Sequence, residues 1–245
     1  MAKQSSSTFK ESTISRCQEP AEGSRLKVKA IIIDMDGTIT KFNLDYMTAR
    51  QRALGELERL GLKTPDMTEQ VNLFVILNKL KENCEPEQFS KLRSTFYGFF
   101  EEMEVKAAED VSLYPGAEKT LQELRSKRLK IGLLTNNSRA GTELTLKRLH
   151  LEALFDAVVT RDDCEEMKPA SAPIKKILAE LGVSTEAAIL VGDGVMDMIA
   201  AKAAGLRSVA VSTGPFPIKR LLKAEPDYLL GSVNELPLLI ELLGT

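Results

Sequence analysis

The sequence predicts an α/β fold: a doubly wound parallel sheet with an inserted all-helical cap domain. Short apolar runs rich in β-branched residues alternate with amphipathic stretches along most of the 245 residues, and this alternation is typical of a parallel sheet covered on both faces. One long stretch after the first apolar run shows only helical periodicity. The hydrophobic fraction, 43%, is sufficient for a packed core.

The beginning of the chain has a different composition. Residues 1–26 are largely polar and Ser-rich, with little apolar periodicity, so we expect a flexible N-terminal tail. The tail has no secretory hydrophobic region, and no run of about 18 apolar residues occurs in the chain. The three cysteines are scattered and form no C-x-x-C pair, which fits a reducing compartment. A cytoplasmic location is therefore expected.

The predicted strands are apolar runs of the kind that are buried on both faces of a sheet. Three strong runs cover residues 28–33, ending at Asp34, and residues 130–134 and 188–191. Weaker runs cover residues 157–159, 208–211 and 228–230.

The helices predicted between these strands have apolar residues three to four positions apart. They cover residues 117–127, 141–149, 172–181, 195–204 and 234–243. Gly182 and Gly205 follow two of them directly, where a glycine commonly ends a helix.

The stretch between the first and second strands contains no strand-like run. It predicts three amphipathic helices, at residues 46–60, 68–80 and 87–105. The organisation predicted is a tail (1–26), a core (27–42 and 113–245) and a helical cap (43–112). Because open α/β sheets bind ligands outside the carboxyl ends of their strands, we expect the cap to cover the site.

Charge and composition exclude several classes of function. The 33 Lys and Arg residues nearly balance the 35 Asp and Glu residues, leaving a formal charge of -2. A nucleic-acid partner is therefore not expected, and neither is a membrane partner. His150 is the only histidine, which excludes most His-rich zinc sites and leaves a Ser-His-Asp site only if His150 is the base. Catalysis is expected to depend on carboxylates, lysine and hydroxyls.

The first chemical motif ends the first predicted strand and reads Asp34-Met35-Asp36-Gly37-Thr38. One carboxylate can attack phosphorus while the second serves as acid or base. Gly37 permits a sharp turn. The alternative is an ordinary Asp-Gly turn, which the second Asp and the preceding isoleucine strand disfavour.

A second acidic motif follows the strand predicted at residues 188–191. Asp193 leaves that strand, and Asp197 lies about one helical turn further on. Carboxylates gathered at neighbouring strand ends repel one another, and a hard cation that binds oxygen ligands, such as Mg²⁺, would offset that repulsion. Alone, this motif could be a turn with an N-capping Asp.

Two weaker signals lie between these motifs. Thr135 and Asn136 end a strand and lead into a helix, where a hydroxyl and backbone N–H groups could bind phosphate. Lys168 precedes Pro169, and its compact charge suits a phosphate or a carboxylate nucleophile. Seen singly, these residues could be a polar capping loop and a solvated lysine.

The order of the four motifs resembles the haloacid dehalogenase superfamily, specifically its phosphatase branch. The helical insertion is similar to the cap of the phosphoglycolate phosphatase and phosphoglucomutase-like members. The resemblance covers the chain from about residue 27 to the end, and implies a Rossmann-like core. It is carried by Asp34-Met35-Asp36-Gly37-Thr38, Thr135-Asn136, Lys168-Pro169 and Gly192-Asp193 with Asp197.

The resemblance also implies roles at the matched positions. Asp34 would form an aspartyl-phosphate, and Asp36 would protonate the leaving group and then activate water. Lys168 would neutralise Asp34 and the phosphate. The resemblance implies that Thr135 and the Asn136 backbone would hold the phosphoryl oxygens. It implies that Mg²⁺ would be bound by Asp34, the Asp36 carbonyl and Asp193. Asp197 would support the metal shell or Lys168.

The function expected is Mg²⁺-dependent hydrolysis of a small organic phosphate monoester such as phosphoglycolate, by a monomer or a homodimer. One alternative is a sugar phosphomutase with the same residues. Another is a non-catalytic phosphate-binding regulator. Binding alone would not require all four of the charged residues Asp34, Asp36, Lys168 and Asp193. Arg50, Arg93 and Tyr97 are candidate substrate contacts in the cap, and the charge run at residues 101–104 is expected to be a solvated face.

Overall fold

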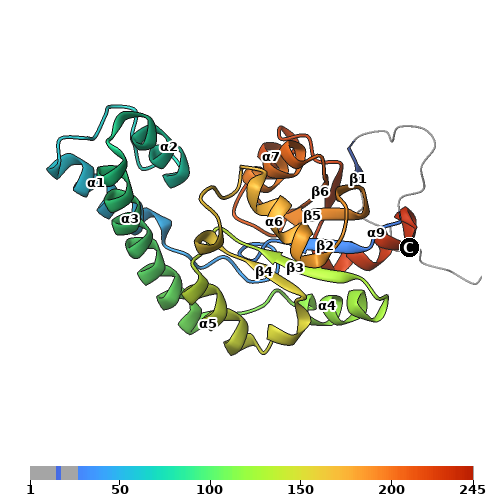
Figure 1. Ribbon diagram of the computed structural model, residues 1–245. Helices are drawn as coiled ribbons and strands as arrows, with labels where there is room; N and C mark the ends of the chain where they lie inside the picture. The colour runs from blue at the N-terminus through green and yellow to red at the C-terminus, as the bar shows by residue number, and fades with distance from the viewer. Residues whose placement is uncertain (1–14, 18–26, 245) are drawn as a thin grey trace, which may run out of the picture.

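The computed structural model describes residues 15–17 and 27–244. This part of the chain forms one sheet in the order β1-β7-β6-β5-β2-β3-β4 (Figure 1). The α/β prediction is confirmed, because the strands from β2 onward all run parallel. Their bounds are β2 (Ala30–Ile33), β3 (Lys130–Leu134), β4 (Ala157–Val159), β5 (Ala188–Gly192), β6 (Arg207–Val211) and β7 (Tyr228–Leu230).

One strand at the sheet edge was not predicted. β1 (Ser15–Arg16) pairs antiparallel with β7, and the next backbone N–H, that of Cys17, donates to Asp227 O at 3.0 Å. A strand of this length shows no sequence periodicity, so only its partner reveals it. The remainder of the predicted tail lies outside the described residues.

Helices cover both faces of the sheet (Figure 1). One face carries α4 (Ala117–Ser126), α5 (Arg139–Leu149) and α9 (Leu236–Leu243). The other carries α6 (Ala172–Leu181) and α7 (Val195–Ala204). A short helix, α8 (Ile218–Leu222), follows β6 and was not predicted.

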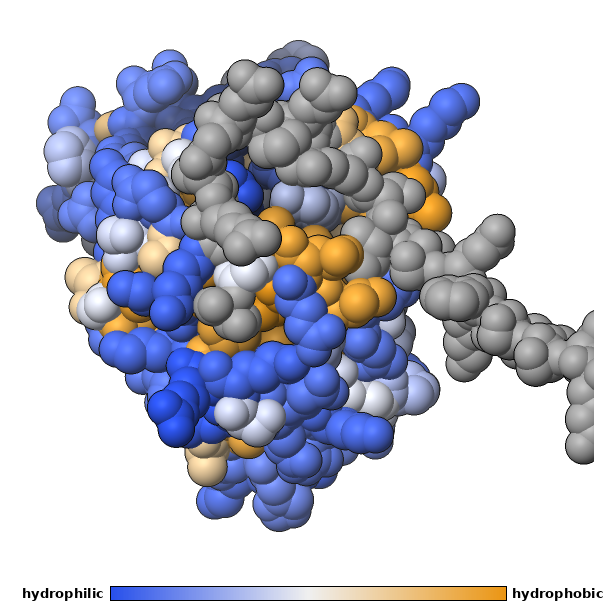
Figure 2. All heavy atoms as spheres, turned by 90° about the vertical axis from the view of Figure 1, so that its right-hand side faces the viewer, coloured by the Kyte–Doolittle hydropathy of each residue, from blue (hydrophilic) through white to orange (hydrophobic). Residues whose placement is uncertain are grey.

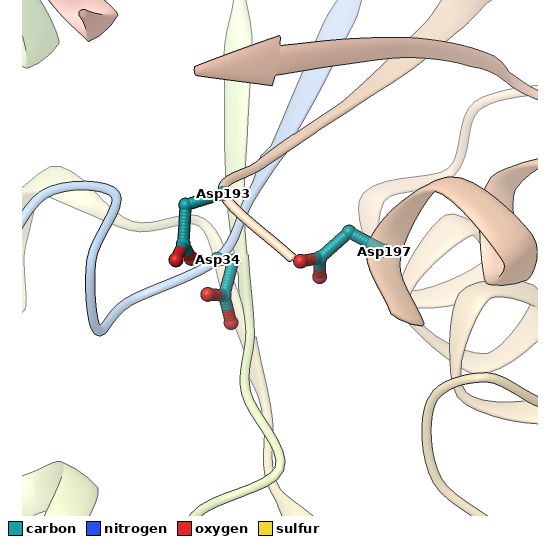
Figure 3. Close-up of side chains that lie close together, drawn as sticks. All are labelled: Asp34, Asp193 and Asp197. Atoms are coloured by element: carbon teal, nitrogen blue, oxygen red, sulfur yellow. The ribbon is translucent and has the colours of Figure 1, made fainter. Parts of the chain in front are cut away.

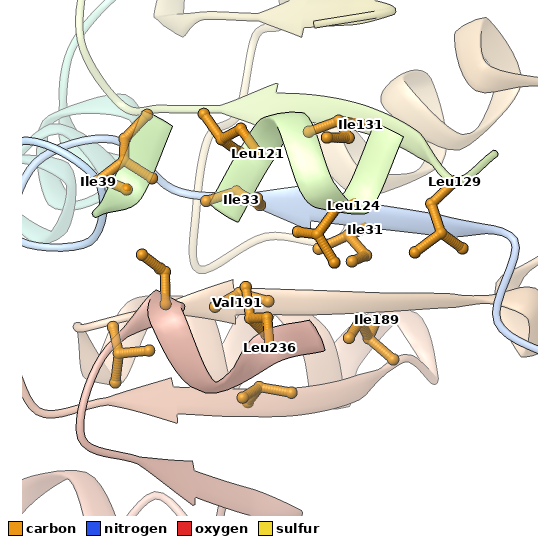
Figure 4. Packing of buried hydrophobic residues seen from close by; sticks show 14 of the residues in the cluster. Ile31, Ile33, Ile39, Leu121, Leu124, Leu129, Ile131, Ile189, Val191 and Leu236 are labelled. Carbon is orange, nitrogen blue, oxygen red and sulfur yellow. The ribbon is translucent and has the colours of Figure 1, made fainter. Parts of the chain in front are cut away.

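β2 shows why the predicted strands lack polar alternation. Ile31 and Ile33 pack towards α4 and α9 (Figure 4), whereas Ala30 and Ile32 pack towards α6 and α7. Successive strand residues point to opposite faces, and here both faces are dry. The continuous apolar run therefore places β2 at the centre of the core.

The insertion after β2 folds into helices with an apolar cluster of their own, which includes Leu57, Ile76 and Phe96. These helices are α1 (Tyr46–Arg59), α2 (Leu73–Asn83) and α3 (Pro86–Ala107). α2 begins later than predicted because Asn72 caps it, accepting from Phe74 N at 2.8 Å.

The chain enters and leaves the cap through adjacent segments. Thr40 forms an isolated bridge with Leu113, and Lys41 N donates to Ser112 O at 2.8 Å. The cap is therefore tethered at neighbouring points beside the end of β2. The exact domain boundaries stay a prediction.

The end of the core away from the cap is mostly hydrophilic, with apolar side chains gathered in one area (Figure 2). α9 and the last described residues lie at this end (Figure 1). No helix within residues 15–17 and 27–244 combines the length and apolar character needed to cross a membrane. The residues singled out by the sequence lie at the opposite, cap-facing end of the strands.

Candidate active site

The site begins where the strand order reverses. β2 has β3 on one side and β5 on the other, and Ile33 of β2 lies beside Val191 of β5. Asp34 N donates to Val191 O at 2.9 Å, so Asp34 and Asp193 leave the sheet together. This is the crevice in which doubly wound sheets bind ligands.

Three carboxylates meet at this edge. One oxygen from each of Asp34, Asp193 and Asp197 lies within 4.8 Å of the others, and all three residues are buried (Figure 3). Asp34 follows β2 and Asp193 follows β5, while Asp197 projects from the first turn of α7. The two acidic motifs predicted from sequence therefore form one cluster.

Lys168 forms ion pairs with two members of this cluster. Its Nζ lies 2.6 Å from Asp34 Oδ1 and 2.6 Å from Asp197 Oδ1, and it also donates to Leu134 O at 3.0 Å. Burial opposes its charge, but Asp197 and Asp34 outweigh that effect and hold the pKa of Lys168 above its ordinary value. This lysine is a buried cation, not the solvated residue that its motif alone allowed.

Both carboxylate oxygens of Asp197 accept hydrogen bonds from neighbouring groups. Besides the ion pair with Lys168, its Oδ2 accepts from Gly194 N at 3.0 Å. Asp193 is engaged far less, by the Thr38 hydroxyl at 3.3 Å. Gly37, at φ 84°, and Gly214 both approach its carboxylate so closely that a Cβ at either position would collide with it.

The donor set at this edge fits a divalent cation. Desolvation and the charge of Asp34 raise the pKa of Asp193 to about 8. Desolvation, only partly offset by Lys168, raises the pKa of Asp34 to about 6. Two buried carboxylates that ionise reluctantly are what a hard cation with oxygen ligands would stabilise.

Asp36 lies apart from the carboxylate cluster. Its Oδ1 accepts from the Thr40 hydroxyl at 3.0 Å, and its Oδ2 accepts from Asn137 Nδ2 at 2.5 Å. Desolvation, followed by the charge of Asp34, raises the pKa of Asp36 to about 7. Asp36 can therefore carry or release a proton near neutral pH.

The loop after β3 is tied to Lys168. The Asn136 side chain accepts from Lys168 N at 3.1 Å and donates to Lys168 O at 2.9 Å. The Thr135 hydroxyl accepts from Asn137 N at 3.2 Å, and its own proton remains available to a ligand. The two weaker sequence signals are thus parts of one hydrogen-bonded unit.

Sequence reasoning missed two residues that hold Asp36, namely Thr40 and Asn137. It was also wrong about Glu104, which was expected on a solvated face but is 3% exposed. The spacing contained the signal, since Phe96, Phe100 and Glu104 follow one another at i, i+4 on the buried side of α3. Arg161, the partner of Glu104, lies after β4, and no spacing links it to α3.

A cleft lies between the cap and the core beside Lys168. The cavity is about 480 Å³. Lys81, Arg93 and Tyr97 line it from the cap, while Met167 and Pro169 line it from the core. Of the suggested cap residues, Arg93 and Tyr97 therefore face this cleft, whereas Arg50 donates to Glu69 O at 3.1 Å within the cap.

Comparison with known proteins places this site in a family. The sequence model of the haloacid dehalogenase-like hydrolases matches residues 31–211. The pyrophosphatase PpaX of Bacillus cereus (strain AH820) is 28% identical over 213 residues, covering 86% of this chain and 95% of its own.

Solved structures agree in fold. A hydrolase from Pseudomonas syringae superposes with a TM-score of 0.68 at 21% identity, covering 89% of this chain and all (100%) of its own. A predicted phosphoglycolate phosphatase from Haemophilus somnus superposes with a TM-score of 0.59 at 20% identity, covering 87% and 98%. The chain, whose core carries an inserted helical cap, therefore belongs to the haloacid dehalogenase-like hydrolases.

Proposed function

We propose that this chain hydrolyses a small organic phosphate monoester through an aspartyl-phosphate on Asp34, with Mg²⁺ as cofactor. One observation carries the proposal. The buried Lys168 ammonium contacts Asp34 and Asp197, both at 2.6 Å, where β2 and β5 end together. A cation in that position holds Asp34 ionised as a nucleophile and would also attract an incoming phosphate.

In the first step an Asp34 oxygen attacks phosphorus, and the bond from phosphorus to the leaving oxygen breaks. Asp36 donates its proton to that oxygen, so the leaving group departs as an alcohol. The pKa of about 7 supports this role, because part of the Asp36 population is protonated at neutral pH. The Thr135 hydroxyl and the Asn136 backbone N–H hold the phosphoryl oxygens.

In the second step water attacks the same phosphorus. Asp36, now a carboxylate, accepts the proton of that water. The bond between phosphorus and the Asp34 oxygen breaks, which releases inorganic phosphate and restores the Asp34 carboxylate. Thr40 and Asn137 hold Asp36 in both steps, and the covalent route divides one slow displacement into two faster ones.

Asp34, Asp193 and the Asp36 carbonyl are the proposed Mg²⁺ ligands. Asp197 is proposed to support the metal shell and Lys168, because its two oxygens already accept hydrogen bonds from Lys168 Nζ and Gly194 N. When bound, Mg²⁺ supplies positive charge that offsets the repulsion between Asp34 and the phosphate.

Mg²⁺ is expected to raise the melting temperature, and to do so more at pH 8 than at pH 5. The raised pKa values of Asp34, Asp36 and Asp193, from 3.8 to about 6, 7 and 8, mean that the folded metal-free protein binds more protons than the unfolded chain within this range. The contribution of these three groups to the free energy of unfolding therefore falls as the pH rises from about 4 to about 8, and a cation offsets that loss. At about 100 times Kd the increase should be roughly 5–10 °C at pH 8.

Thermal melts with and without Mg²⁺ at both pH values measure this effect. Asp193→Asn is the matched control, because it removes one proposed ligand and its charge together. An equal shift at pH 5 and pH 8, or a full shift in Asp193→Asn, would contradict the assignment.

The cleft beside Lys168 suits a small polar leaving group. Its volume is about 480 Å³, and its lining combines the cationic Lys81 and Arg93 of the cap with the acidic Glu165 and Glu166 of the core. Phosphoglycolate has this character. Pyrophosphate has it also, and the similarity to a pyrophosphatase makes it a second candidate.

A panel of phosphate esters assayed with Mg²⁺ tests the proposal. It should include phosphoglycolate, pyrophosphate, sugar phosphates and an aryl phosphate, with both inorganic phosphate and organic products measured. Release of phosphate is expected, whereas an isomerised sugar phosphate without it would indicate a mutase. No turnover on any member would favour a non-catalytic phosphate-binding protein.

A further inference from the structure

A buried ion pair joins the cap to the core outside the reacting groups. Arg161 Nη1 lies 2.7 Å from Glu104 Oε1, and Nη2 lies 3.0 Å from Glu104 Oε2. The side chains are 2% and 1% exposed, respectively. Glu104 belongs to the last turn of α3, and Arg161 opens the short turn after β4. Burying an ion pair costs desolvation energy, so a buried pair often adds little to stability. The role of this pair is therefore inferred from its other contacts.

These contacts reach three consecutive residues of the loop after β3. Glu104 Oε2 accepts from Ser138 N at 2.8 Å. Arg161 Nη1 donates to Asn136 O at 3.0 Å, and Arg161 N donates to Asn137 O at 2.9 Å. The ion pair and the Arg161 backbone N–H therefore hold the backbone of residues 136–138.

That backbone carries the amide that holds Asp36. Asn137 Nδ2 lies 2.5 Å from Asp36 Oδ2, and the Tyr46 hydroxyl contacts Asn137 Oδ1 at 3.4 Å. A displacement of residues 136–138 would therefore displace the partner of Asp36 and the N–H groups proposed to hold phosphate.

The same pair fastens the cap helix. The Arg161 guanidinium lies 4.8 Å from the centroid of the Tyr97 ring, and Tyr97 O accepts from Nη2 at 3.4 Å. α5 approaches α3 closely at Gly141, where an added Cβ would lie 2.8 Å from Glu104 Cβ. Because Tyr97 also lines the cleft, one ion pair connects the cleft wall to the loop after β3.

We propose that Glu104 and Arg161 are positioning residues, which hold residues 136–138 and the end of α3 together so that Asn137 orients Asp36 for proton transfer. This inference rests on the proposed function, since it assigns the pair a part in the same reaction. It predicts that losing the pair slows the proton-dependent step more than it weakens folding.

Three variants test this: Glu104→Gln, Arg161→Met, and the double replacement Glu104→Leu with Arg161→Met. The double variant substitutes an apolar pair for the ions, which commonly restores the stability of a buried ion pair. We expect its melting temperature to return close to wild type while kcat stays roughly 100-fold lower, the scale of a misplaced catalytic group. Glu104→Gln should lose less, because its amide oxygen can still accept from Ser138 N.

The leaving group separates positioning from a purely structural role. The nitrophenolate of a nitrophenyl phosphate leaves with little protonation, whereas the alkoxide of an alkyl phosphate needs a proton from Asp36. The loss in kcat should therefore be about tenfold larger for the alkyl ester, with KM changing little. Lys127→Met, which breaks the surface ion pair with Glu241, should leave kcat unchanged for both substrates.

The inference is overturned if the folded double variant regains wild-type kcat, or if both esters lose activity equally. It is also overturned, together with the proposed function, if wild type hydrolyses no phosphate ester. Normal turnover by wild type with an unaffected double variant removes the positioning role alone, so the two failures are distinguishable.

Discussion

Asp34→Asn is expected to lower kcat by about 10⁴-fold or more while the protein still folds. The amide has nearly the shape of the carboxylate but cannot attack phosphorus, so no aspartyl-phosphate forms. Folding should be retained because Lys168 keeps its contact with Asp197 at 2.6 Å. Steady-state kinetics on an aryl phosphate measure the loss, and acid-quenched protein shows whether phosphate is attached.

Asp36→Asn is the matched control for that experiment. It leaves the nucleophile intact but removes the acid and base, so slow hydrolysis should allow phosphorylated protein to accumulate from an aryl phosphate. If Asp34→Asn kept activity within tenfold of wild type, or still became phosphorylated at residue 34, the mechanism would be wrong.

Lys168→Met is expected to damage stability and activity together. It leaves Asp34 and Asp197 as buried carboxylates without their shared cation, which should cost about 3–5 kcal/mol in the free energy of unfolding at pH 8. It also removes a charge that would stabilise the transferring phosphoryl group, so kcat should fall by about 10²- to 10³-fold. Urea unfolding and steady-state kinetics measure the two effects.

The double variant Lys168→Met with Asp197→Asn separates these effects. Removing one buried carboxylate should recover part of the lost stability, while kcat stays low because the cation near Asp34 is still missing. Recovery of activity in the double variant would show that Lys168 acts on the fold alone.

The strands and their order along the chain were predictable because both faces of this sheet are dry. The core strands are mostly apolar runs, and such runs are visible without any knowledge of their partners. β1 and α8 were missed, since a two-residue strand and a five-residue helix are too short for periodicity to show.

The sequence predicts which strand ends meet at the candidate site, but not the contacts that its side chains make there. Asp34, Asp36 and Asp193 each follow a strand, and parallel topology brings those strand ends to one edge. The contacts of Asp36 with Thr40 and Asn137, at 3.0 and 2.5 Å, depend on how the turn after β2 meets the loop after β3. No spacing in the chain encodes that meeting.

Glu104 shows the same limit from the opposite direction. Its neighbours Glu101 and Glu102 are exposed, and a run of charged residues in the sequence predicts that Glu104 is exposed as well. Only the docking of α3 against α5, with Arg161 arriving from the end of β4, makes Glu104 a buried partner.

The sequence by itself determined the fold class, the helical insertion and the residues expected to carry the chemistry, because periodicity and motif order are properties of the chain alone. The tertiary structure decided which charges are desolvated and which groups share a partner. Those properties arise from residues as far apart in the sequence as Asp34, Lys168 and Asp197, which meet only when the parallel sheet has formed. Raised pKa values and buried ion pairs depend on these contacts between distant residues, so they exist only in the folded protein.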